Sequence, residues 1–168
     1  MKRRIRGRCW LVGDNVPTDA IVRSHLITRP MEEIRRHVLE GVNPRFPREV
    51  QPDDLLVAGR HFGQSSGRAI AVRALKATGV GCVLAESFAR TFYRNAFEMG
   101  LPILECPGIG GLVSEGDVLV VDLETGIVVD ETTGARAQAT PIPPFLRRML
   151  EAGGIIPIAK QLAEGTDR

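Results

Sequence analysis

A short loop rich in serine and glycine carries the residues of this sequence that are best suited to chemistry. Residues 61–75 read HFGQSSGRAIAVRAL, in which Ser65 and Ser66 come just before Arg68. An arginine can bind a carboxylate through two parallel hydrogen bonds, and the first N–H groups of a helix favour a negative charge. A serine beside these positive features could bind a carboxylate substrate and move a proton on it. The alternative is structural, with Ser65 as a helix cap and Ser66 and Gly67 as ordinary turn residues.

A strand and a helix are expected to hold this loop in place. The apolar run over residues 55–59 is typical of a buried strand, and residues 69–75 have a helical composition. A second apolar run, over residues 79–85, follows the helix. Strand, helix and strand within about 30 residues form a βαβ unit, whose strands should be parallel with a right-handed crossover.

A second polar pair, Thr18 and Asp19, follows a turn over residues 13–17. Such side chains often bond to nearby backbone, which would make the pair a capped turn. The functional alternative is that the Asp19 carboxylate orients another group in a site. Residues 23–30 then form a loop before a helix predicted over 31–39, and loops of this kind often carry specificity.

The remaining pattern predicts an α/β fold that ends in antiparallel strands. The other elements expected are a strand over 8–12, a helix over 86–99, a strand over 101–106, a flexible turn over 107–111, a hairpin of 118–123 and 126–130, a strand over 136–140, a helix over 145–152 and an apolar stretch over 155–158 that packs back. Residues 1–168 therefore form one domain with a partly parallel βαβ core and antiparallel hairpins. Residues 1–6 and 163–168 are expected to fray.

Composition argues against several classes of protein. The chain has 168 residues, which suits one domain, and its formal net charge of +2 gives no reason to expect nucleic acid as a partner. The basic start of the chain is not followed by an apolar segment, so it is not a secretory signal. No stretch approaches the roughly 20 apolar residues of a membrane span. We therefore expect a cytoplasmic protein that binds no membrane.

Three cysteines, Cys9, Cys82 and Cys106, each lie in or beside an apolar run. Their odd number, their wide spacing and the lack of a C-x-x-C pair do not fit a disulfide framework. Three cysteines could ligate an iron–sulfur cluster, but free cysteine is among the most buried residue types. We therefore expect buried structural thiols, no metal site on this chain and a reducing compartment.

Five stretches together resemble one family of enzyme subunits. They read GDNVPTDAIV, DLLVAGRHFGQSSGRAIAVRAL, VGCVLAESFARTFYRNAFEMGLPILEC, EGDVLVVDLETG and EAGGIIPIAK, and they cover nearly the whole chain. In this order they resemble the small subunit of 3-isopropylmalate dehydratase and homoaconitase, the swivelling domain of the aconitase superfamily. The resemblance implies a swivelling β/β/α domain and a hydro-lyase that dehydrates or isomerises a substituted malate, as in leucine biosynthesis.

The resemblance also implies roles for individual residues and a partner. In this family a separate large subunit holds a [4Fe-4S] cluster whose iron takes the substrate hydroxyl, and the small subunit closes over the hydroxy-diacid. We therefore expect a heterodimer or heterotetramer. Ser66 takes the place of the serine that removes or returns a proton, Arg68 that of the carboxylate-binding arginine, and Asp19 that of an aspartate that supports a catalytic side chain of the partner. The other residues expected at the substrate are Thr18, Ser65, Gly67, Ile27 and Thr28.

The loop departs from the family pattern FGCGSSREHA, because this chain reads FGQSSGRAIA. The replacements are Gln64 for cysteine, Ser65 for glycine, Gly67 for the second serine, and Ala69 with Ile70 for a Glu-His pair. A register slipped by one residue would make Ser65 and Ser66 the two family serines. We prefer the ungapped register, because Arg68 and the residues that flank the loop then match the pattern.

The loop over residues 25–28, His-Leu-Ile-Thr, bears on the substrate. An arginine at its third position would suit the second acidic arm of homoaconitate, whereas Ile27 favours an alkyl-substituted malate. Isopropylmalate is the first expectation, and a smaller alkylmalate such as 2,3-dimethylmalate would fit the altered loop. Two other hypotheses stay open: a non-catalytic module that binds a carboxylate or regulates a partner, and a phosphate-binding α/β protein, although the lysine of a P-loop is missing.

Overall fold

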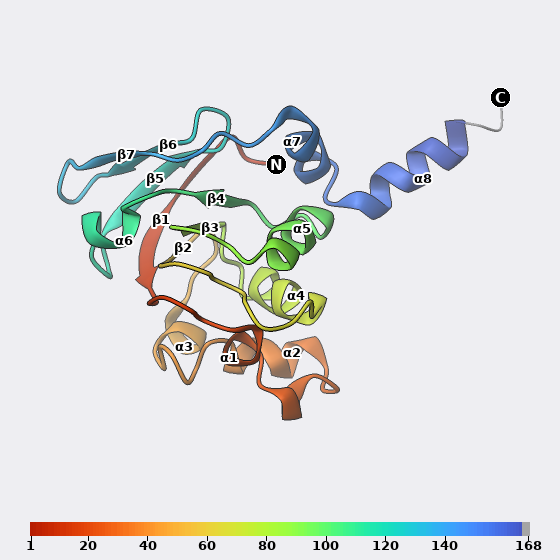
Figure 1. Cartoon of the computed structure of the whole chain (residues 1–168), viewed down its shortest axis with the longest axis horizontal. Coiled ribbons are helices and arrows are strands. Elements are labelled where there is room, and N and C mark those ends of the chain that lie inside the picture. Colours follow the sequence, from red (N-terminus) through yellow and green to blue (C-terminus); the bar gives the residue numbers. More distant parts are fainter. Residues whose placement is uncertain (166–168) are drawn as a thin grey trace.

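The structure is a computed structural model that describes residues 1–165, and it is built on one seven-stranded sheet (Figure 1). The strands are β1 (Arg4–Leu11), β2 (Leu55–Ala58), β3 (Cys82–Ala85), β4 (Ile103–Glu105), β5 (Val118–Asp122), β6 (Ile127–Asp130) and β7 (Arg136–Gln138), in the order β4-β3-β2-β1-β5-β6-β7. Strands β1 to β4 pair in parallel, and β5, β6 and β7 continue the sheet from β1 as antiparallel neighbours. The predicted α/β fold with a partly parallel core is confirmed.

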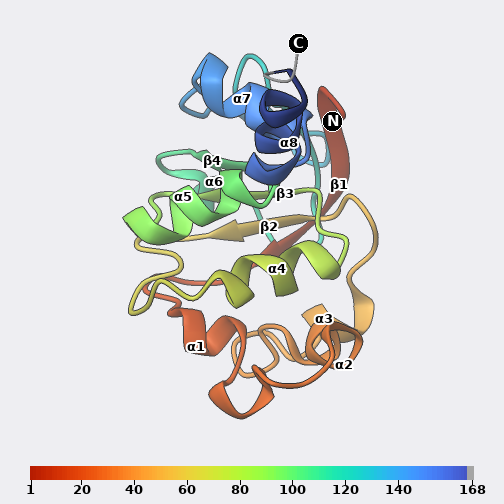
Figure 2. The same cartoon turned by 90° about the vertical axis from the view of Figure 1, so that its right-hand side faces the viewer.

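Helices cover the parallel strands. They are α1 (Thr18–Ile21), α2 (Met31–Ile34), α3 (Phe46–Glu49), α4 (Ala69–Ala77), α5 (Arg90–Glu98), α6 (Ile109–Leu112), α7 (Pro144–Glu151) and α8 (Ile155–Gly165). Figure 2 shows α4 and α5 in front of the parallel strands, with α1, α2 and α3 grouped below α4. The predicted unit β2-α4-β3 is confirmed, since Leu55 is in register with Cys82 and Ala58 with Ala85.

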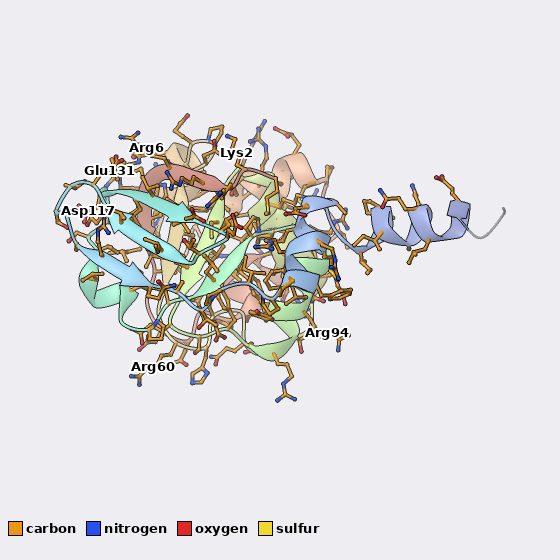
Figure 3. All side chains as sticks on the ribbon, turned by 90° about the horizontal axis from the view of Figure 1, so that it is seen from above. Lys2, Arg6, Arg60, Arg94, Asp117 and Glu131 are labelled. Atoms are coloured by element: carbon orange, nitrogen blue, oxygen red, sulfur yellow. The ribbon has the colours of Figure 1, made fainter. Side chains whose placement is uncertain are left out.

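The core lies where the parallel strands meet these helices. All four residues of β2 and all four of β3 are buried. Their continuous apolar sequences, LLVA and CVLA, suit strands that are covered on both faces. Most charged side chains lie at the surface, as the pair of Arg6 on β1 and Glu131 after β6 illustrates (Figure 3), with 2.8 Å between Nε and Oε2, whereas Asp54, Asp117, Asp122 and Asp130 are buried. Among residues 1–165, no helix has the length and the hydrophobicity that crossing a bilayer requires.

The chain starts differently from the prediction. Residues 1–6 were expected to fray, but β1 already begins at Arg4, and Ile5 is buried and in register with Val121 on β5. Arginine alternates with uncharged residues in this strand, so its charges alone suggest an exposed end of the chain and not a paired strand. The helix predicted over 31–39 ends early, because α2 gives way to a 3-10 turn over Arg35–His37 and Leu39 takes a φ of 58°.

Three later elements also differ. Helix α5 begins at Arg90 and not at residue 86, because residues 86–89 run beside the Ser66 loop, where Phe88 forms a bridge with Phe62. The turn predicted over 107–111 is in part the short helix α6. Residues 155–158 pack back only in part: Ile158 packs against the core, but these residues begin α8, which has no buried residue and projects from the body in Figure 1. Residues 163–165 are helical within α8, and the rest of the predicted frayed end, 166–168, lies outside the described residues.

Candidate active site

The two polar segments singled out in the sequence meet at one edge of the sheet. The segment with Thr18 and Asp19 follows β1, and the loop with Ser66 and Arg68 follows β2. Because β1 and β2 are parallel, both segments leave the sheet at the carboxyl ends of their strands, where α/β proteins commonly bind ligands. The Oγ1 atom of Thr18 lies 2.6 Å from the Oγ atom of Ser66.

Backbone hydrogen bonds fasten the two segments to each other. The Gly63 N–H donates to the Val16 carbonyl at 2.8 Å, and the Thr18 N–H donates to the Gln64 carbonyl at 3.0 Å. The Gln64 side chain adds a third bond, to the Asn15 carbonyl at 3.2 Å. Ser66 is therefore positioned by the segment that follows β1 as much as by its own loop.

The loop turns sharply over aromatic rings. Gly63 has a φ of 81°, and a Cβ atom there would lie 2.3 Å from the Phe92 ring, so the position requires glycine. Ser65 also has a positive φ, of 84°, which L-residues adopt at a cost of about 1–2 kcal/mol. The family pattern has glycine at this position. The backbone thus favours the ungapped register, in which Ser66 and not Ser65 matches the serine that transfers the proton.

Helix α4 places a positive end beside Ser66. The helix begins at Ala69, with Arg68 as its N-cap, so the partial positive charge of its first turn lies next to the loop. Ser66 itself is half-buried, whereas Thr18 behind it is only 3% exposed. The serine hydroxyl therefore has a buried hydroxyl on one side and the open face of the loop on the other.

Arg68 is exposed and linked to the loop that was expected to carry specificity. Its Nη1 atom donates to Ser24 Oγ at 3.2 Å. Within residues 1–165 Arg68 forms no ion pair, whereas Arg60 at the start of the same loop points outward (Figure 3) and lies 3.6 Å from a Glu86 oxygen. The Arg68 guanidinium can therefore donate hydrogen bonds to the carboxylate of a ligand. Ser24 was not singled out from the sequence, because a lone serine in a loop carries no local signal.

A second contact missed from the sequence fixes the end of the loop. Asn95 on α5 donates to the Gly67 carbonyl at 3.2 Å. A Cβ atom at Gly67 would lie 3.0 Å from the Thr91 methyl group, so the serine of the family pattern would be crowded here. Gly67 therefore avoids a close contact with α5 that the serine of the family pattern would make.

The other predicted site residues are brought close to the loop only in part. Asp19, Ser65 and Thr28 are exposed, and Ile27 is 40% exposed. The Asp19 carboxylate makes no hydrogen bond or ion pair with residues 1–165, so it can reach a partner chain. Thr18, which was also expected at the substrate, is buried, and its hydroxyl faces Ser66.

The three cysteines are buried and free, as predicted. Burial raises the pKa of the Cys9 thiol to about 12 and that of Cys106 to about 11, and burial also raises the pKa of Cys82. The residues that the structure describes include no group of three or more histidine, cysteine or acidic side chains that could hold a metal ion. These residues therefore do not fit an iron–sulfur cluster.

Comparisons with known proteins identify the family of the chain. A family model described as "Aconitase C-terminal domain" matches residues 31–107. The "Isopropylmalate/citramalate isomerase small subunit" of Methanocaldococcus jannaschii is 46% identical over 166 residues, which are 98% of this chain and 99% of the relative. The "3-isopropylmalate dehydratase small subunit 1" of Methanopyrus kandleri is 44% identical over 162 residues, 96% of this chain and 95% of the relative.

A solved structure gives the same result for the fold. The crystal structure of a 3-isopropylmalate dehydratase from Methanocaldococcus jannaschii superposes with a TM-score of 0.90 at 33% sequence identity, and the match covers 98% of this chain and 99% of that chain. Identity above 40% over nearly the full length, together with this likeness, leaves no other family to consider. The chain belongs to the family of 3-isopropylmalate dehydratase small subunits, within the aconitase superfamily.

Proposed function

We propose that this chain is the small subunit of a hydro-lyase that dehydrates and rehydrates a substituted malate, with 3-isopropylmalate as its first substrate. The observation that supports this most is the placement of Ser66 against the buried Thr18 and two residues before Arg68, which forms no ion pair within residues 1–165. This arrangement offers one group for a proton and one for a carboxylate on the same exposed loop. The names of the relatives supply the substrate class.

In the proposed reaction Arg68 and Ser66 have separate roles. Arg68 binds a substrate carboxylate and so fixes the adjacent carbon near Ser66. Ser66, as an alkoxide, takes the proton from that carbon and becomes a neutral hydroxyl. The electron pair of the broken C–H bond forms the C=C bond as the hydroxyl group leaves the neighbouring carbon as hydroxide. In the isomerisation, hydroxide adds to the carbon that lost its proton, and Ser66 delivers its proton to the carbon that lost the hydroxyl group, which regenerates the alkoxide.

Ile27 and its loop support an alkyl-substituted substrate. The loop is tied to Arg68 through Ser24, and Ile27 follows the turn that begins at Ser24, so we expect the apolar Ile27 side chain to approach the substrate without offering it a charge. A second acidic arm, as in homoaconitate, would find no cation at this position. A second candidate substrate is citramalate, because the name of the Methanocaldococcus jannaschii relative includes it; 2,3-dimethylmalate belongs to the same class of small alkylmalates.

The proposal includes a partner subunit that completes the site. The side chains of Asp19, Ser65 and Arg68 face solvent, so the loop needs a second surface to exclude water from the substrate. We assign that surface, and the [4Fe-4S] cluster, to a large subunit in a cytoplasmic heterodimer or heterotetramer. If the assembled pair bound its diacid without turnover, the chain would instead be a non-catalytic carboxylate-binding module.

A pair of neighbouring serines tests the assignment. The complex with the large subunit is prepared without oxygen, and S66A is compared with S65A, which removes an adjacent hydroxyl that faces solvent. A general base contributes about 10²–10⁴-fold to a rate. We expect S66A to lose at least about 100-fold of kcat on that basis and S65A to stay within a few-fold of the wild type. Full turnover by S66A would contradict the proposed role, and a loss confined to S65A would show the slipped register.

A further inference from the structure

We propose that Thr18 is a positioning residue for the base, because its buried hydroxyl donates a hydrogen bond to Ser66 and stabilises the serine as an alkoxide. This inference rests on the proposed function of Ser66. The two oxygen atoms lie 2.6 Å apart, within the range of O–H···O bonds. From this distance alone either hydroxyl could be the donor, so the direction has to be argued from the surroundings.

The surroundings of Thr18 offer its hydroxyl no second hydrogen-bond partner among the residues that the structure describes. The residue is 3% exposed, and within residues 1–165 its side chain bonds only to Ser66. A hydroxyl in such a place cannot exchange its bond for one with water. Its proton is therefore directed at Ser66 Oγ whenever that atom can accept it.

The backbone of Thr18 is also fixed on both sides. Its N–H donates to the Gln64 carbonyl at 3.0 Å, and its carbonyl accepts from the N–H of Val22, the C-cap of α1, at 3.0 Å. Gln64 is two residues before Ser66 in the same loop. The donor and its acceptor are thus held at a set distance, which is the condition for a dipole that needs no reorganisation during the reaction.

The protonation state of Ser66 gives the direction of the hydrogen bond between Thr18 and Ser66. An alkoxide has no proton and can only accept, so Thr18 must be the donor when Ser66 acts as the base. A hydrogen bond to a charged acceptor is about twice as strong as a neutral one. When Ser66 takes the proton from the substrate carbon, Thr18 can remain the donor, and the new Ser66 proton points to the open side, from which it can be returned.

This role differs from direct substrate binding. Because Thr18 lies behind Ser66 and is buried, a substrate on the exposed loop meets Ser66 first. Loss of the Thr18 hydroxyl should therefore change the basicity of Ser66 and leave the binding of the diacid at Arg68 intact. The signature is a change in kcat and in the pH profile with an unchanged KM.

The test compares T18V with T18S in the complete complex with the large subunit. Valine keeps the volume of threonine and removes the donor, whereas serine keeps the donor. The loss of a bond to a charged acceptor predicts that T18V lowers kcat about 10- to 100-fold with KM within about two-fold. The pH at which the rate increases should be higher by about one to two units in T18V, because the alkoxide is harder to form. T18S should restore at least a third of the wild-type kcat.

A double mutant separates this role from a structural one. If Thr18 acts only through Ser66, T18V should have no further effect on the residual rate of S66A. Should T18V fail to assemble with the large subunit, T18A carries the same comparison. An equal loss in the S66A background, or an unchanged pH profile in an active T18V or T18A complex, would overturn the inference. A wild-type complex that turns over no alkylmalate would instead overturn the proposed function.

Discussion

The replacement of Arg68 by lysine tests carboxylate binding without removing the positive charge. Arg68 is exposed, and one of its nitrogens already donates to Ser24 Oγ at 3.2 Å, which leaves the other donors of the planar fork to a ligand. Lysine offers a point charge with no fork, so a substrate carboxylate should lose one of two parallel bonds.

The magnitude follows from the exposure of the site. A hydrogen bond between charged groups contributes about 1.5–3 kcal/mol, and solvent screening at an exposed arginine favours the lower end. A loss of about 1.4 kcal/mol corresponds to a tenfold weaker interaction. We therefore expect R68K to raise KM about tenfold while kcat changes less than about threefold, because the bond is present in both ground state and transition state.

Steady-state kinetics of the assembled complex measure this effect. The matched control is R73K, the same substitution at an exposed arginine of α4 that lines a groove of about 650 Å³ beside α8 and not the Ser66 loop. R73K should leave both constants unchanged. A wild-type KM in R68K, or an equal increase in R73K, would remove Arg68 from the substrate site.

Three further predictions concern stability. S65G should raise the free energy of unfolding by about 0.5–1 kcal/mol in urea titrations, because glycine relieves the positive φ at the cost of some chain entropy; S65A keeps the strain, and an equal gain there would contradict the reasoning. D54A should cost about 3–5 kcal/mol, since Asp54 is buried and accepts from Trp10 Nε1 at 2.9 Å, and an unaltered urea midpoint would show that this bond is dispensable. The buried thiols have a raised pKa in the folded state, so stability should fall as pH rises above about 8.5, where only the unfolded thiols ionise. A Cys9→Ala variant should lose less stability between pH 8 and 10 than the wild type, and an identical loss would refute this cause.

The sequence predicts well the parts of the fold that are coded locally. The runs LLVA and CVLA are apolar throughout, and both strands are buried on both faces. The glycine-serine loop between a strand and a helix, and the hairpin of β5 and β6, follow from turn residues beside strand patterns. Ser66 and Arg68 can also be assigned to one loop from the sequence, because they are only two positions apart.

What the sequence does not predict depends on contacts between distant segments. Ser24 and Arg68 are 44 positions apart, and Asn95 and Gly67 are 28 apart, so no local pattern reveals either bond. The late start of α5 has the same origin, because Phe88 is held by its bridge to Phe62. Helix α8 was missed for another reason: its first residues indicated packing, which Ile158 makes, but none of its residues is buried and no helix was expected there.

The central claim is tested most directly by turnover of the anaerobically reconstituted complex with a panel of diacids. The absorbance of the unsaturated product is followed with 3-isopropylmalate, 2,3-dimethylmalate, citramalate and homocitrate in parallel, for the wild type and for S66A. We expect turnover of an alkylmalate, with 3-isopropylmalate first, little or none of homocitrate, and a loss of at least about 100-fold in S66A. An intact complex that turns over none of the four substrates, or an S66A complex as active as the wild type, would contradict it.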